Sequence, residues 1–147
     1  MCVQDSATVQ EKRAAPKQRR LLAATIRASA QWRRGKADEF RDDEDALREN
    51  SRAAIALRTL ANFVDGLPDG DQDLNLPALS RTEEREGGLV LTGDALVLLS
   101  RFGLGGSWRG GAPSESQMRN MLRRLDGIEA RERKARKQRA EAGYGDD

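Results

Sequence analysis

The side chains of this chain that could do chemistry are mainly cations, and they gather at its two ends. Residues 1–36 hold nine Lys and Arg against two Asp and Glu, and residues 103–147 hold ten against seven. Residues 37–102 reverse this balance, with seven cations against fifteen carboxylates. Clustered cations bind phosphate groups, an anionic membrane surface or acidic protein surfaces. We therefore expect two basic ends around an acidic middle, which could itself hold the N-terminal end in place.

The cations expected to bind nucleic-acid phosphates belong to these two ends. At the N-terminal end they follow helical spacing along one face, and at the C-terminal end they form an almost continuous run. A solvated helix face explains the same charges equally well. The expected nucleic-acid-binding residues are Lys17, Arg20, Arg27, Arg34, Arg119, Arg123, Arg124, Arg131, Arg133, Lys134, Arg136, Lys137 and Arg139.

The composition excludes several kinds of catalytic and metal site. The chain has no histidine, which rules out a Ser/His/Asp triad and any histidine-ligated metal. Its single cysteine, Cys2, cannot form a disulfide or a Cys-rich zinc site within one chain. We therefore expect a protein that is not an enzyme and that carries no metal and no cofactor.

Two acidic segments could be mistaken for cation sites. Six carboxylates lie between Asp38 and Asp45, but consecutive helical residues point in different directions, so a solvated cluster or a clamp onto the basic arm explains them better. Residues 69–75 alternate carboxylates like the start of a calcium loop. Leu74 stands where that loop needs glycine, and Ser80 stands where it needs a glutamate. We predict a polar turn there.

The glycine-rich run at residues 103–111 could cradle an anion, because glycine lets backbone N–H groups approach closely. A phosphate-binding loop follows a strand and ends with a lysine, whereas this run follows a predicted helix and contains no lysine. We therefore interpret residues 103–113 as a flexible connector. An exposed Trp108 could stack on a base or on a partner side chain.

The elements that must position the cations begin with a basic amphipathic helix. Pro16 suits an early helical position and Gly35 a helix end, so we predict a helix from about Pro16 to Gly35. The cations Arg20, Arg27 and Arg34 line one side, with Lys17 at its edge. The opposite face is apolar and consists of Leu21, Leu22, Thr25, Ile26 and Trp32.

A second helix is predicted over residues 37–64. Asp38 and Glu39 suit its N-terminal end, where the helix dipole favours negative charge. Gly66, in a left-handed conformation, and Pro68 form its predicted stop. Its buried stripe is expected to be Leu47, Ala54, Leu57, Leu60, Ala61 and Val64.

The next elements are a short strand at residues 89–91 and a helix at residues 95–102 that Thr92 caps. Residues 95–99 are apolar on all sides, which predicts that this helix is enclosed and forms the centre of the core.

The last helix begins at a capping box formed by Ser114 and Gln117. Its apolar stripe, which we expect to stop packing near Ile128, consists of Met118, Met121, Leu122, Leu125 and Ile128. The rest should form a basic extension in solvent. Its start could also be the recognition helix of a helix-turn-helix with Ser116, Gln117, Arg119, Asn120 and Arg123 facing a major groove, although the connector at residues 103–113 is long for that motif.

Together these patterns predict a small, mainly α domain of about four helices with at most one short strand and with charged, partly disordered ends. We expect an arm at residues 1–36, a helical core at 37–128 and a basic extension with an acidic tail end at 129–147. The predicted function is a non-enzymatic nucleic-acid-associated accessory or regulatory protein. The alternative is a helical protein–protein adaptor or assembly component without nucleic acid, whose apolar helix faces could bind a protein partner or a second copy.

The expected location is the cytoplasm. The longest apolar stretches are far shorter than the roughly 18 residues of a membrane span, so integral membrane association is not expected. An Arg-rich amphipathic start is also typical of a mitochondrial presequence, but Asp5 and Glu11 count against that interpretation.

Overall fold

The computed structural model describes residues 2–71, 73, 76–104 and 112–142, with the side chains of residues 17–142 in these ranges except that of Ser80. Helices make up most of these residues, which confirms the predicted small, mainly α fold. The elements are α1 (Cys2–Glu39), α2 (Glu44–Asp65), α3 (Pro77–Ser80), β1 (Glu84–Arg85), β2 (Gly88–Leu89), α4 (Gly93–Ser100) and α5 (Glu115–Glu141).

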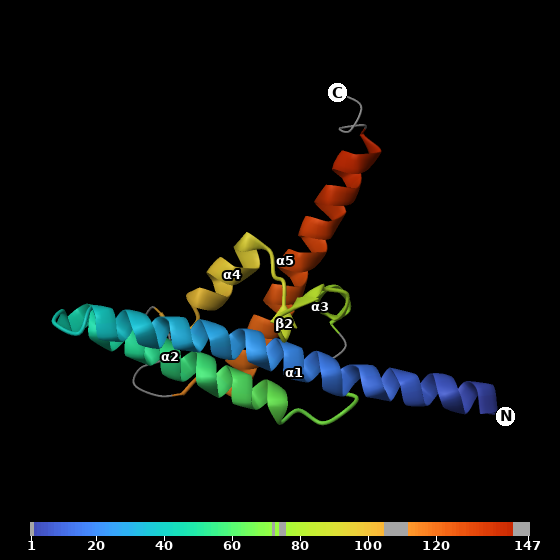
Figure 1. The fold of residues 1–147 in the computed structure, drawn as a ribbon, viewed down its shortest axis with the longest axis horizontal. Coiled ribbons are helices and arrows are strands. Elements are labelled where there is room, and N and C mark those ends of the chain that lie inside the picture. The colour runs from blue at the N-terminus through green and yellow to red at the C-terminus, as the bar shows by residue number, and fades with distance from the viewer. Residues whose placement is uncertain (1, 72, 74–75, 105–111, 143–147) are drawn as a thin grey trace.

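α1 and α2 form a long antiparallel hairpin, and the remaining elements pack against it (Figure 1). β2 and α4 contact α1, while α3 and α4 contact α5. The N-terminal part of α1 and the C-terminal part of α5 both extend beyond the packed body, in different directions (Figure 1). Residues 22–30 of α1 belong to the core, because Leu22, Ala23, Ile26 and Ala30 are buried.

The boundary between the first two helices differs from the prediction. α1 begins at Cys2 and continues through both Pro16 and Gly35 to Glu39, so the predicted start and end of the first helix are wrong. Residues 10–15 before Pro16 are good helix formers, whereas a proline inside a helix costs about 3 kcal/mol and a glycine about 1 kcal/mol. Ala37, two positions after Gly35, is buried, which favours continuation of the helix past the glycine.

Asp43 marks the true start of the second helix. Its side chain accepts hydrogen bonds from the backbone N–H groups of Asp45 and Ala46. The prediction that α2 begins at residue 37 is therefore wrong, and Asp38 and Glu39 lie at the C-terminal end of α1. Capping by a short carboxylate stabilises a helix start by about 1 kcal/mol, which fixes the turn at residues 40–43.

α2 ends at Gly66 as predicted, but Gly66 does not adopt the predicted left-handed conformation. Gly66 has φ −87° and ψ −4°, which is right-handed, and its N–H donates to the carbonyls of Asn62 and Phe63. Leu67 is then buried in the core, and its packing fixes the exit of the chain. The predicted stripe of α2 is buried, except that Leu47 is half-buried.

The strand predicted at residues 89–91 is found as β2, which shares only Leu89 with the predicted range and pairs with a second short strand, β1. β1 and β2 are antiparallel, and Glu86 and Gly87 make the turn between them with φ of 56° and 81°. Thr25 of α1 fixes this hairpin, because its Oγ1 accepts a hydrogen bond from the N–H of Leu89 at 2.7 Å. A Cβ on Gly88 would lie only 2.8 Å from the same oxygen, so the contact requires glycine.

α4 covers the core from one side. Thr92 caps it as predicted, since its hydroxyl accepts a hydrogen bond from the N–H of Ala95. Leu96 and Val97 are 44% and 51% exposed, so the prediction that this helix forms the centre of the core is wrong. Five of the largest fully buried side chains come from α2 and α5 and one each from α1, α3 and α4, and they are Ile26, Leu57, Leu60, Leu79, Leu99, Leu122, Leu125 and Val64.

α5 begins with the predicted capping box between Ser114 and Gln117. Its apolar stripe packs as predicted, with Ile128 half-buried at its end. The last buried side chain of the helix is that of Glu129, which is 3% exposed and accepts a hydrogen bond from the N–H of Thr92 at 2.7 Å. Packing of α5 thus stops one residue after Ile128, and the helix continues to Glu141.

Candidate nucleic-acid interface

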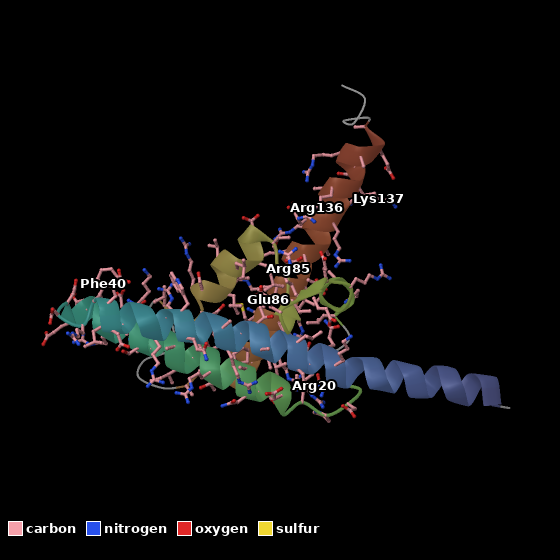
Figure 2. All side chains as sticks on the ribbon, in the orientation of Figure 1. Arg20, Phe40, Arg85, Glu86, Arg136 and Lys137 are labelled. Atoms are coloured by element: carbon pink, nitrogen blue, oxygen red, sulfur yellow. The ribbon has the colours of Figure 1, made fainter. Side chains whose placement is uncertain are left out.

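The C-terminal part of α5 carries the densest group of cations in the described part of the chain. Beyond Glu129 the helix projects away from the α1–α2 hairpin, and Arg136 and Lys137 point outward from it (Figure 2). Successive helical residues are rotated by about 100°, which spreads the cations over all sides of the helix. We call this the α5 tip, and its cations are Arg131, Arg133, Lys134, Arg136, Lys137 and Arg139.

Few carboxylates compete for these cations. The guanidinium nitrogens of Arg136 and Arg139 lie 3.6 and 3.7 Å from a carboxylate oxygen of Glu132. Arg133 donates to the hydroxyl of Thr82 at 3.4 Å. Three cations of the α5 tip form no ion pair with another described residue, and these are Arg131, Lys134 and Lys137. Exposed pairs such as those with Glu132 contribute little free energy and can be exchanged for a phosphate.

The N-terminal cations are more strongly engaged within the fold. Arg27 forms an ion pair with Asp65 and also donates to Asn62, and Lys17 lies 3.5 Å from Glu84. Arg20 and Arg34 are exposed, and neither has an ion pair with another described residue. The first basic segment therefore presents fewer free cations than its sequence suggests.

The expected clamp between the basic arm and the acidic cluster at residues 38–45 takes another form. The ion pairs that the described residues show for this cluster are local, between Lys36 and Glu39 and between Arg48 and Asp45. The arm is held instead by the end of α2 and the loop that follows it. Arg19 donates to the Leu67 carbonyl at 2.7 Å and to the Asp69 carboxylate at 2.8 Å.

Arg119 and Arg123 hold the loop after α2 against α5. Arg119 pairs with Asp71 at 3.0 Å and with Asp73, and Arg123 reaches Asp73 at 3.2 Å. The Asp73 side chain is only 2% exposed, so this is an internal contact. It directs Arg119 into the fold, away from the outward face that the helix-turn-helix interpretation assigns to it. Arg124 is exposed and lines a shallow groove with Arg101.

The hydrogen bonds from Arg119 hold the pKa of Asp71 below its ordinary value, and the same bonds raise the pKa of Arg119. An unfolded aspartate titrates near pH 3.9, at about its ordinary value. The stabilisation from Asp71 is therefore present above about pH 4 and is lost as the pH falls through the lower folded-state pKa.

The substitution Asp71→Asn is expected to lower the free energy of unfolding by about 1 kcal/mol at pH 7 and to have little effect at the acidic end of the range. Urea unfolding midpoints at neutral and acidic pH measure this difference. Asp42→Asn is the matched control, because Asp42 is exposed on the α1–α2 turn. An equal loss of stability at both pH values would contradict the role given to Asp71.

No metal centre is found among the described residues. They contain no group of three or more Asp, Glu, Cys or His arranged to hold a metal ion. The segment at 69–75 is described only in part, and its Asp71 and Asp73 are bound by arginine. The glycine-rich run lies outside the described residues from 105 to 111, together with Trp108, so its predicted anion binding stays a prediction.

Known proteins provide no guide to this site. No protein-family model, no curated protein and no solved structure matches the chain. Within the described residues, no helix is long and apolar enough to cross a membrane.

Sequence reasoning missed a half-buried arginine that joins three helices. Arg33 donates to the Asn50 side chain at 2.9 Å and to the Ser100 carbonyl at 2.6 Å, and so joins α1, α2 and α4. Burial lowers the pKa of Arg33. Helical spacing could have revealed it, because Arg33 continues the buried stripe of Ile26, Ala30 and Ala37.

Proposed function

We propose that the protein is a nucleic-acid-associated accessory protein that binds the phosphate backbone with the α5 tip and catalyses no reaction. One observation carries this proposal, namely that six cations surround a helix that has left the packed core. A helix that is polar on all sides has no apolar face to bury against a partner. Electrostatic attraction is the main binding energy that this surface offers.

Nucleic acid suits this arrangement better than a flat anionic surface does. The major groove of duplex DNA admits an α-helix, with phosphates along both of its walls. Lys134 and Arg136 are exposed and point to nearly opposite sides of α5, so cations of one helix can reach both walls. A flat surface would leave the cations on the far side of the helix unused.

The side chains of the α5 tip favour binding without sequence preference. Cations contact phosphates irrespective of base, and the only amide side chain among residues 131–141 is that of Gln138. The N-terminal cations are secondary in this proposal because Arg27 both pairs with Asp65 and donates to Asn62 within the fold.

A salt titration with labelled duplex DNA and duplex RNA tests the proposed function. If between three and six cations replace counterions, the logarithm of the binding constant should fall against the logarithm of salt concentration with a slope of about −3 to −5. The two duplexes together cover both groove geometries. If neither duplex binds the protein at low salt, the proposal is rejected.

A further inference from the structure

A shallow groove runs between α1 and α2, with a volume of about 480 Å³. Its residues on α1 are spaced by three or four positions and form one stripe, and the same holds for α2. The floor is made of small apolar side chains and the walls of longer polar ones. The lining residues are Arg27, Ala30, Gln31, Arg34, Ala37, Ser51, Ala54, Ile55, Arg58 and Asn62.

The groove is positively charged and partly apolar. Three arginines line it and no carboxylate does. Arg27 pairs with Asp65 at one end, whereas Arg34 and Arg58 have no ion pair with any residue that the structure describes. Ile55 is 57% exposed at the groove, which is unusual for an isoleucine. An occupant should therefore present both carboxylates and an apolar side chain.

The turn of the same hairpin has the opposite character. Residues 38–45 contain six carboxylates and one cation, and Phe40 is 45% exposed among them. Figure 2 shows Phe40 at the far end of the α1–α2 hairpin. Asp38 and Asp42 have no ion pair with another described residue. We call residues 38–45 the acidic turn.

We propose that two copies of this chain associate antiparallel through their α1–α2 hairpins, with the acidic turn of each copy in the groove of the other. Both complementary surfaces belong to one hairpin, which is the condition for a closed two-fold interface. Phe40 of one copy covers Ile55 of its partner, and carboxylates of the turn meet Arg34 and Arg58. Repulsion between the two acidic turns disfavours the parallel arrangement.

The dimensions of the hairpin are compatible with this contact. The groove extends from Ala37 to Arg27 along α1, which at 1.5 Å per residue is roughly 15 Å. A single helical turn with its loop fits in that length. Nucleic acid would satisfy the arginines but would leave Ile55 and Phe40 exposed, so a second copy accounts for more of the observed features.

Sedimentation equilibrium of the full chain, from low to high micromolar concentration, tests the dimer. The wild type should approach twice the monomer mass as concentration rises. The groove variant Arg34→Glu/Arg58→Glu and the turn variant Asp38→Lys/Asp42→Lys should each weaken association at least tenfold. An equimolar mixture of the two variants should recover a heterodimer, because both contacts are then between opposite charges again.

The control variant Arg81→Glu/Arg85→Glu has the same charge change as the groove variant but lies at and beside β1, and it should associate like the wild type. Circular dichroism confirms that each variant is folded. A wild type that stays monomeric at all concentrations would overturn the proposal. So would a mixture of the two variants that forms no heterodimer, or a groove variant that binds duplex DNA less well but associates normally.

Discussion

Replacing Arg131, Lys134 and Lys137 with glutamine is expected to lower the affinity for duplex nucleic acid on the order of 100-fold at low salt and to reduce the salt slope by about 3. These cations have no ion pair with another described residue, so their loss removes phosphate contacts without disturbing the fold. Glutamine is nearly as good a helix former as lysine or arginine, which keeps the α5 helix intact. Fluorescence anisotropy over a salt series measures both quantities.

The matched control replaces Arg41, Arg48 and Arg101 with glutamine. These arginines are exposed and give the same change in net charge, but they belong to the turn after α1, to α2 and to the end of α4, and none belongs to α5. We expect less than a fivefold change in affinity from this control, through the general field alone. Equal losses in the two triple variants would show that overall charge, and not the α5 tip, determines binding.

Local signals predicted the starts and stops of several helices. Thr92 and Ser114 cap α4 and α5 as their sequences indicate, because a cap depends on residues within one turn of it. Gly66 ends α2 for the same reason, although Leu67 and its packing decide the conformation of the glycine. Such features require no knowledge of the remaining chain.

Contacts between residues far apart in the sequence could not be predicted from local patterns. The pairing of Arg119 with Asp73 spans 46 positions, and nothing near either residue distinguishes it from an exposed cation or carboxylate. The α1–α2 boundary was misplaced because good helix formers continue on both sides of residues 40–43, and only the Asp43 cap marks the turn. The cations of the α5 tip were easier to place, since the apolar stripe of their helix ends at Ile128.

The exposure of one side of α4, which its composition does not predict, can be tested by measuring stability. An all-apolar helix is usually enclosed, yet Leu96 is 44% exposed while Leu99 in the same helix is fully buried. Composition cannot distinguish the two leucines, which lie three positions apart and only about 60° apart around the helix, whereas the structure buries Leu99 and leaves Leu96 partly exposed. Their contributions to stability should therefore differ strongly.

The substitution Leu99→Ala is expected to lower the free energy of unfolding by about 3 kcal/mol, and Leu96→Ala by less than about 1 kcal/mol. Both changes alter helix propensity equally, so the difference between them reports burial alone. A loss of about 3 kcal/mol is a large share of the 5–15 kcal/mol that holds a typical domain together. Urea unfolding gives both values, and equal losses would mean that α4 is enclosed on both sides, as its composition first indicates.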